Sequence, residues 1–450
     1  MSKEVIQNQL GAKLHGSLDF KIHGGIKLHG KVDTNYSKNG AMGLLCAAIL
    51  NKGKTTLNGI PRIEEVNRIV EVLTSIGFDI NWIGPNSLLI LPPKNIKLDE
   101  INRASASSTR TIIMFMGPLI HYFDSFKLPN SQGCKMGKRT ISAHIFGLEK
   151  MGVKIKVEEK NYIVSHNKLK TSEIIMYESG DTAAENLIMA ASLIPGITTI
   201  KFVSSNYMVQ EVCFFLEKLG VKIEGIGTST LIVHGVKEIN TDIEYTNSED
   251  PIESMMYISA AATTNSEITV KRCPIDFLEL ELLKLEKMGL KFSITKPYLA
   301  ENNRTKLADI SIKTSKLVAL DDKIYGRPFP GINIDNLPFF VPIATQAKGK
   351  TLIHDWTWEN RAIYFMELNR LGADMVLADP HRVFIDGPTK LKAAQVVCPP
   401  ALRPAMIILI AMLAAEGVSV LRNVYSINRG YESIVDKLNS LGARIEVFQS

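Results

Sequence analysis

The feature that most constrains the fold is a pattern that recurs six times along the chain. Each instance is a helix-like apolar pattern that ends in a Leu-Gly, Ile-Gly or Met-Gly step and continues as a short alternating strand. The glycines, separated by 75, 68, 69, 83 and 70 residues, are Gly77, Gly152, Gly220, Gly289, Gly372 and Gly442. Each is typical of the left-handed residue just past a helix C-terminus. Units of this length are too long for a solenoid, so they indicate self-contained folding units.

A second helical pattern lies between these marks. Its clearest instances are GAMGLLCAAIL, TAAENLIMAASLI, IESMMYISAAATT and RPAMIILIAMLAA. Because these segments are apolar nearly all round, we expect them to be buried in domain centres. The sequence therefore predicts an α/β protein of two similar inside-out lobes, each of three repeated units with sheets outside a buried helix bundle.

The repeats also predict where the chain passes between lobes. We expect one crossing near Thr34 to Tyr36 and the other near Ser248 to Glu249, just before the fourth unit's apolar helix. The first lobe is then 37–248. The second lobe is discontinuous and consists of 1–36 and 249–450.

Composition excludes several classes of protein. With 450 residues, 45% hydrophobic and 22% charged, the chain can bury two or more cores. Its five cysteines are far apart, without a CxxC pair or a His/Cys cluster, which argues against a disulfide framework and against a metal site.

The same reasoning predicts a cytoplasmic protein with no membrane span. The N-terminus lacks an apolar signal core, and the longest apolar run, 405–415, is too short to span a bilayer. The net charge of +6 is spread along the chain without basic tracts, so we expect no nucleic-acid partner. Small anionic ligands suit this charge better. The sequence does not predict an oligomeric state.

A glycine-bounded loop, GCKMGKR at 133–139, carries one thiol and three cations. Nearby cations stabilise a thiolate, so Cys134 is a candidate reactive cysteine. A solvated surface loop is the alternative from this loop alone.

Several stretches taken together resemble the enolpyruvyl transferases. They are SKNGAMGLLCAAIL, MGPLI, GCKMGKRTISAHIFGLEKMG, WENRAIYFMELNRLGA and INRGYESIVDKLNSLGA. The resemblance runs through nearly the whole chain and is strongest to the branch whose acceptor is UDP-N-acetylglucosamine. It implies transfer of the enolpyruvyl group of phosphoenolpyruvate to a hydroxyl, with release of phosphate, in peptidoglycan precursor synthesis. It implies no metal and no organic cofactor.

The resemblance also implies a clamp for phosphoenolpyruvate, whose phosphate and carboxylate need several converging donors. The positions that match the family's clamp are Lys38, Arg110, Arg139, Arg403 and Arg429, with Arg361 in a family-like position nearby. Arginine suits bidentate capture of an anion, whereas lysine supplies a mobile point charge.

The family's reaction assigns further roles. Cys134 matches the general acid that protonates C3, and Asp335 matches the base that takes the acceptor's proton. Asn39 matches a residue that orients the acceptor or the intermediate through its amide. Two weaker assignments have structural alternatives: His144 contacts the nucleotide or caps a helix, and Asp250 with Glu253 supports the acceptor or serves a helix N-terminus.

Three departures from the family pattern bear on the acceptor, one at the reaction centre and two in the region expected to hold the nucleotide. Ala401 stands where the family has an aspartate, Ser142 replaces the family's aspartate near the uracil, and Gly180-Asp181-Thr182 replaces Ser-Val-Gly. A changed buried polar contact redirects substrate choice strongly. Two alternatives therefore stay open: another acceptor, such as the uridine nucleotide UMP, or a catalytically idle paralogue that binds a nucleotide or a partner protein. Shikimate 3-phosphate is less expected, because that branch does not use the cysteine loop.

Overall fold

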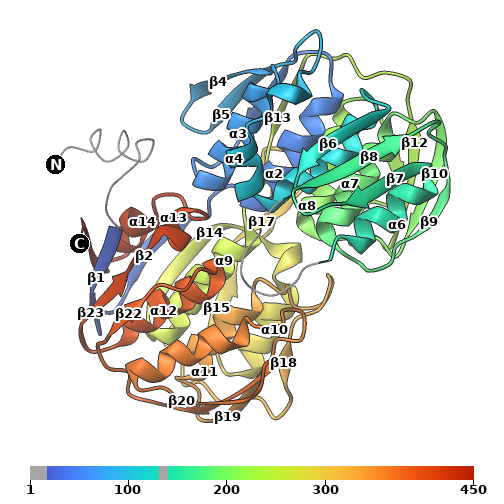
Figure 1. Ribbon diagram of the computed structural model, residues 1–450. Coiled ribbons are helices and arrows are strands. Elements are labelled where there is room, and N and C mark those ends of the chain that lie inside the picture. The colour runs from blue at the N-terminus through green and yellow to red at the C-terminus, as the bar shows by residue number, and fades with distance from the viewer. Residues whose placement is uncertain (1–17, 131–139, 450) are drawn as a thin grey trace.

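A computed structural model describes residues 18–130 and 140–449. Their strands form six separate sheets, three built from strands between residues 55 and 246 and three from strands in 18–33 and 267–449. Figure 1 shows the two groups as separate lobes, the first blue to green and the second yellow to red with β1 and β2 in blue. We propose 37–248 as one domain and 1–36 with 249–450 as the other.

The first lobe contains three small sheets with the orders β13-β3-β5-β4, β6-β8-β7 and β11-β12-β10-β9. Their strands are β3 (Thr55–Asn58), β4 (Asp79–Gly84), β5 (Ser87–Leu91), β6 (Ser125–Pro129), β7 (Val153–Val157), β8 (Asn161–His166), β9 (Glu173–Ile175), β10 (Gly196–Lys201), β11 (Lys222–Glu224), β12 (Thr230–Gly235) and β13 (Ile243–Thr246). In the first and third of these sheets one parallel pair joins an otherwise antiparallel ladder.

The second lobe also has three sheets, with the orders β15-β17-β14-β2, β18-β19-β21-β20 and β22-β23-β1-β24. Their strands are β1 (Leu18–Gly24), β2 (His29–Asp33), β14 (Glu267–Pro274), β15 (Lys291–Ile294), β16 (Tyr298–Leu299), β17 (Lys306–Lys313), β18 (Ile324–Tyr325), β19 (Gly349–His354), β20 (Asp374–Asp379), β21 (Arg382–Gly387), β22 (Gln395–Val397), β23 (Gly417–Arg422) and β24 (Arg444–Gln449). The N-terminal strands β1 and β2 thus complete sheets whose other strands come from the C-terminal half.

The predicted apolar helices form the centres of the lobes. They are α2 (Lys38–Ala47) and α7 (Asp181–Ser192) in the first lobe, and α9 (Pro251–Thr263) and α12 (Leu402–Ala414) in the second. Every residue of α9 is buried, as is every residue of α12 except the last. The third central element of each lobe is shorter and contains proline: η3 (Arg110–Phe115) with α5 (Met116–Leu119), and η5 (Leu337–Phe339) with α11 (Phe340–Ala344).

Six further helices precede the six repeat glycines. They are α3 (Glu64–Ser75), α6 (Ser142–Lys150), α8 (Tyr207–Lys218), α10 (Glu279–Lys287), η6 (Ala362–Leu371) and α14 (Ile434–Ser440). The φ angles of the six glycines lie between 87° and 109°, so the predicted left-handed helix ends are confirmed. The remaining short helices are η1 (Ala48–Leu50), η2 (Leu98–Glu100), α4 (Arg103–Ser108), η4 (Ile275–Phe277) and α13 (Tyr425–Asn428).

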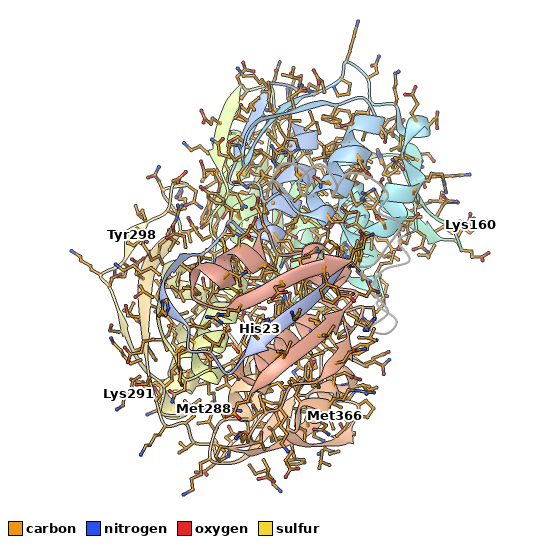
Figure 2. The ribbon with its side chains drawn as sticks, turned by 90° about the vertical axis from the view of Figure 1, so that its left-hand side faces the viewer. His23, Lys160, Met288, Lys291, Tyr298 and Met366 are labelled. Carbon is orange, nitrogen blue, oxygen red and sulfur yellow. The ribbon has the colours of Figure 1, made fainter. Side chains whose placement is uncertain are left out.

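The sheets cover the helices and carry charged and polar side chains on their outer faces. Figure 2 shows His23 on β1, Lys291 on β15 and Lys160 in the turn between β7 and β8, all on the outside of the molecule. His23 pairs across the sheet with Glu446, at 3.1 Å. The predicted inside-out α/β arrangement is confirmed. In the part of the chain that the structure describes, no helix is long and apolar enough to cross a membrane.

The two predicted crossings lie side by side. Tyr36 and Glu249 form an antiparallel bridge, the Ser37 amide donates to the Ser248 carbonyl at 2.7 Å, and the Asp250 amide donates to the Asn35 carbonyl at 2.8 Å. This double strand leads directly into α2 on one side and α9 on the other. The N-termini of these two central helices are therefore held together, one from each lobe.

Candidate active site

Asp250 joins the starts of α2 and α9. Its Oδ1 accepts the Ile252 amide at 2.8 Å and its Oδ2 accepts the Lys38 amide at 3.2 Å, so one carboxylate caps two helices. The side chain is buried, and burial raises its pKa although Arg403 opposes that shift. The predicted alternative for Asp250, a carboxylate serving a helix N-terminus, is the role that these contacts display.

A charged cluster surrounds the start of α2. The Lys38 ammonium lies 2.8 Å from Glu65 Oε2 and 3.3 Å from Asn39 Oδ1. Burial alone would raise the pKa of the Glu65 carboxyl, but the charges of Lys38 and Arg429 outweigh burial and lower it. Glu65 therefore lies as an anion between a lysine of the first lobe and an arginine of the second.

Arg429 offers a hydrogen-bond donor to a ligand in this cluster. Its Nε is buried and has no hydrogen-bond partner among the described residues. A buried guanidinium donor that lacks an acceptor is costly, so an anionic ligand placed there gains a strong charge-assisted hydrogen bond.

Asp335 lies between two arginines of the second lobe. Its Oδ2 is 3.4 Å from Arg403 Nη2 and its Oδ1 is 3.5 Å from Arg361 Nη1, and 29% of its side chain is exposed. The carboxylate is thus partly open to a ligand and oriented from both sides. Its backbone amide donates to Asn333 Oδ1 at 2.9 Å, which fixes the local turn.

Arg361 is buried and directs most of its donors inward. Its Nε and Nη2 contact the two oxygens of Asp355 at 2.5 and 2.9 Å, and Nη2 also donates to the Ile334 carbonyl at 2.6 Å. The bidentate pair fixes the guanidinium beside Asp335. Substrate binding by Arg361 stays a prediction, whereas its contact with Asp335 is part of the structure.

Arg403, in the first turn of α12, is a buried cation. It donates to the Tyr431 hydroxyl at 2.8 Å. Burial lowers the pKa of its guanidinium, but the interactions with Tyr431, Asp335 and Asp250 outweigh burial and raise it. Arg403 therefore stays charged at the start of a central helix, where the helix dipole also favours an anion.

His144 contacts α7 rather than the amide groups of its own helix α6. Its Nδ1 lies 3.1 Å from Asn186 Nδ2 and its Nε2 lies 3.4 Å from Thr182 Oγ1. Burial, with a smaller contribution from Arg110, lowers its pKa to about 3, so the ring is neutral. Its nucleotide contact stays a prediction.

Two further predicted residues, Arg110 and Glu253, lie at the edges of this region. Arg110 Nη2 donates to the Thr140 carbonyl at 3.0 Å, next to the start of α6. Glu253 Oε1 accepts the Asn35 amide at 3.2 Å and Lys437 Nζ at 3.3 Å, so it supports the crossing strand. Cys134 and Arg139 lie outside the described residues.

Five residues at the site were not among the predicted ones: Glu65, Asp181, Tyr207, Asp355 and Tyr431. Asp181, at the start of α7, accepts Ser204 Oγ at 2.5 Å and Asn206 Nδ2 at 3.2 Å. Burial raises the pKa of Asp181, and the negative charge of Asp335 in the second lobe adds to the shift. An acidic residue at the start of a predicted helix was the available signal for Glu65 and Asp181, but such residues are common at helix N-termini.

The starts of α2, α7, α9 and α12 therefore face a region shared by both lobes, with cations from each. Such a region favours a ligand that carries several negative charges. Within residues 18–130 and 140–449, no group of three or more His, Cys, Asp or Glu side chains is arranged to hold a metal ion. Among the described residues of this region, the arginines and Lys38 can bind an anionic ligand, and the Asp335 carboxylate can accept a proton.

Comparisons with known proteins identify the class. The family model for EPSP synthase (3-phosphoshikimate 1-carboxyvinyltransferase) matches residues 22–438. The chain belongs to this family of enolpyruvyl (1-carboxyvinyl) transferases, as the sequence motifs predicted.

Individual relatives refine the comparison. The chain is 33% identical over 430 residues to UDP-N-acetylglucosamine 1-carboxyvinyltransferase of Treponema denticola, covering 95% of this chain and 99% of the relative. It is 32% identical over 429 residues to the same enzyme of Borreliella burgdorferi, with the same coverage. The fold matches the crystal structure of the enolpyruvyl transferase NikO from Streptomyces tendae with a TM-score of 0.83 at 20% identity, covering 97% of this chain and 100% of that chain.

Proposed function

We propose that the protein transfers the enolpyruvyl group of phosphoenolpyruvate to a hydroxyl of UDP-N-acetylglucosamine and releases phosphate. The reaction would take place in the cytoplasm and supply peptidoglycan precursors. The observation that carries the proposal is that cations of both lobes gather at the site: Lys38 and Arg429 at Glu65, and Arg361 and Arg403 at the partly exposed carboxylate of Asp335. Full-length identity of about one third to transferases of that name supports this choice of acceptor.

The proposed mechanism uses the site as follows. Lys38, Arg403 and Arg429, with Arg110 and Arg139, bind the phosphate and carboxylate of phosphoenolpyruvate. The acceptor oxygen attacks C2 while its proton passes to Asp335, and Cys134 gives a proton to C3. The tetrahedral intermediate then loses a proton from C3 and expels phosphate, which restores the double bond.

Asp335 is suited to its proposed role by its surroundings. Arg361 and Arg403 keep the carboxylate in one orientation, while its exposed fraction leaves an oxygen accessible to a hydroxyl. Lys38 is suited to bind phosphate because its present partner, Glu65, is also paired electrostatically with Arg429. An incoming phosphate can therefore take over Lys38 without leaving Glu65 unpaired.

A second candidate keeps phosphoenolpyruvate and changes the acceptor to another hydroxyl, such as that of UMP. The departures at the acceptor side favour it. Ala401 precedes α12 without a side-chain cap, and Ser142 Oγ accepts from Thr140 Oγ1 at 2.5 Å, a local contact. Neither position offers the carboxylate that the family pattern places there.

The test measures phosphate release from phosphoenolpyruvate by the purified protein with UDP-N-acetylglucosamine and, separately, with UMP, and identifies the products by mass. Enolpyruvyl-UDP-N-acetylglucosamine is the expected product. Release with UMP alone would establish the second candidate, and no release with either would favour the idle paralogue. Arg403→Lys should reduce release strongly, whereas Arg382→Lys, at an exposed ion pair with Asp379, is the matched control.

A further inference from the structure

Tyr207 carries a contact to the site that the reaction scheme does not use. It is the first residue of α8 and is 5% exposed. Its hydroxyl oxygen accepts the amide of Asn39 Nδ2 at 3.0 Å, while the oxygen of the same amide accepts from Lys38 Nζ at 3.3 Å. Both ends of the Asn39 side chain are therefore bound by protein groups.

The chemistry of these partners fixes which way the amide points. An ammonium group can only donate hydrogen bonds, so the end of the Asn39 amide that faces Lys38 must be the oxygen. The NH₂ group must then face Tyr207, whose phenol oxygen accepts. A phenol can play either role, but with Lys38 in place only acceptance is consistent.

The ring of Tyr207 is itself held by the second lobe. It packs edge-on against Phe277, with centroids 5.8 Å apart and an interplanar angle of 69°, and Phe277 packs on Phe329 at 5.1 Å. Tyr207 belongs to the first-lobe helix α8, whereas both phenylalanines belong to the second lobe. The aromatic contact places the phenol at the junction of the lobes.

The phenol remains neutral in this position. Burial raises its pKa well above the usual value, and the negative charge of Asp250 adds to that shift. Proton transfer by Tyr207 is therefore unfavourable, and its contribution is geometric.

We propose that Tyr207 is a positioning residue for the acceptor, because its hydroxyl orients the amide of Asn39 while Phe277 fixes the ring that carries that hydroxyl. The proposal rests on the proposed function and on the prediction that Asn39 orients the acceptor. A residue of α8 would then support the part of the site that binds the acceptor. Loss of the hydroxyl frees the NH₂ end of Asn39, so the amide must be ordered again each time the acceptor binds.

The kinetic test compares Tyr207→Phe, Asn39→Ala and the double variant. Tyr207→Phe should raise KM for the acceptor about tenfold and leave KM for phosphoenolpyruvate within twofold. The double variant should be no worse than Asn39→Ala, because the phenol acts through the amide. Phe277→Leu, which keeps the hydroxyl but removes the edge contact, should raise KM for the acceptor about threefold.

Tyr122→Phe is the matched control. It also removes a hydrogen-bonded phenol hydroxyl, but that hydroxyl is half-buried and donates to the Ile49 carbonyl at 2.7 Å inside the first lobe. Its kinetics should equal those of the unmodified protein. Additive effects of Tyr207→Phe and Asn39→Ala, or equal changes in both KM values, would overturn the proposal.

A crystal structure of Tyr207→Phe separates this proposal from the proposed function. The Nδ2 end of the Asn39 amide should lose its order, whatever the acceptor is, because Lys38 then holds only the oxygen end. An Asn39 side chain that stays as well ordered with the phenol removed would overturn the positioning role even if the enzyme is active. If the unmodified protein releases no phosphate while Tyr207→Phe still disorders the Asn39 amide, the proposed function fails and only the orientation of Asn39 by Tyr207 stands.

Discussion

The central helices α9 and α12 occupy the same layer of the second lobe, yet their first turns carry opposite charge. Both have 13 residues, are almost entirely buried and begin at the region shared by the lobes. Helix α9 begins after Asp250, whose side chain caps it, and carries Glu253 in its first turn. Helix α12 begins after Ala401, which has no side-chain cap, and carries Arg403.

Burial disfavours the charged form at both helix starts, but the resulting charges differ. It raises the pKa values of Asp250 and Glu253, so the acids at α9 hold protons more readily than exposed ones. At α12 the surrounding negative groups keep Arg403 charged despite burial. Anion binding should therefore depend on the α12 side, while the α9 side supports the connection between lobes and responds to pH.

The largest expected effect concerns Asp335, which lies against Arg403 on the α12 side. Asp335→Asn removes the proposed base and should lower kcat about 1,000-fold with a smaller change in KM for phosphoenolpyruvate. Steady-state phosphate release measures both constants. Asp379→Asn is the matched control, because Asp379 also pairs with an arginine but lies in the outer sheet. A loss below tenfold for Asp335→Asn would contradict the assignment.

The next largest effect concerns Glu211, whose partner Tyr245 lies on β13, the strand before α9. Glu211 on α8 is buried, accepts the Tyr245 hydroxyl at 2.7 Å and accepts Asn302 Nδ2 of the second lobe at 3.3 Å. Burial raises its pKa to about 7. The folded protein therefore keeps a proton on Glu211 up to about pH 7, whereas the unfolded chain releases it near the usual pKa of 4.5. The free energy of unfolding should therefore fall as the pH rises from about 4.5 to 7.

Glu211→Gln removes this titration. Relative to the variant, the unmodified protein should lose about 3 kcal/mol of unfolding free energy between pH 4.5 and pH 8. Urea denaturation of both proteins at a series of pH values measures the difference. Parallel stability curves for the two proteins would show that Glu211 does not titrate in this range.

Removing the cap of α9 should have a smaller effect. Asp250→Ala leaves the Ile252 and Lys38 amides without their acceptor and should destabilise the protein by about 2 kcal/mol. Denaturation at pH 8 measures it. The matched change is Asp276→Ala, an exposed acid paired with Lys306, which should cost less than about 0.5 kcal/mol. Equal effects of the two substitutions would contradict the role of Asp250 as a shared cap.

The repeat glycines and the apolar helices could be predicted from the sequence because each is a local signal. A glycine past a helix end needs positive φ, and an all-apolar helix needs burial, whatever surrounds them. The family motifs added Lys38, Asp335 and Arg403. The partners of these residues could not be predicted in the same way, since Glu65, Asp355 and Tyr207 meet them only through contacts between distant segments.

Ala401 illustrates what the sequence alone cannot predict. A substitution there should have the smallest effect on stability. The sequence shows that a carboxylate is missing there, but only the structure shows that the position is the uncapped start of α12, two residues before Arg403. Ala401→Asp makes α12 resemble α9 and should stabilise the protein by about 1 kcal/mol, because the new carboxylate caps the helix and favours its positive end. Denaturation at pH 8 checks it, with Ala401→Asn as the uncharged cap. Since α12 already carries a buried cation in its first turn, the aspartate should stabilise more than the asparagine, and the reverse order would show that Asp335 and Asp250 already satisfy that cation.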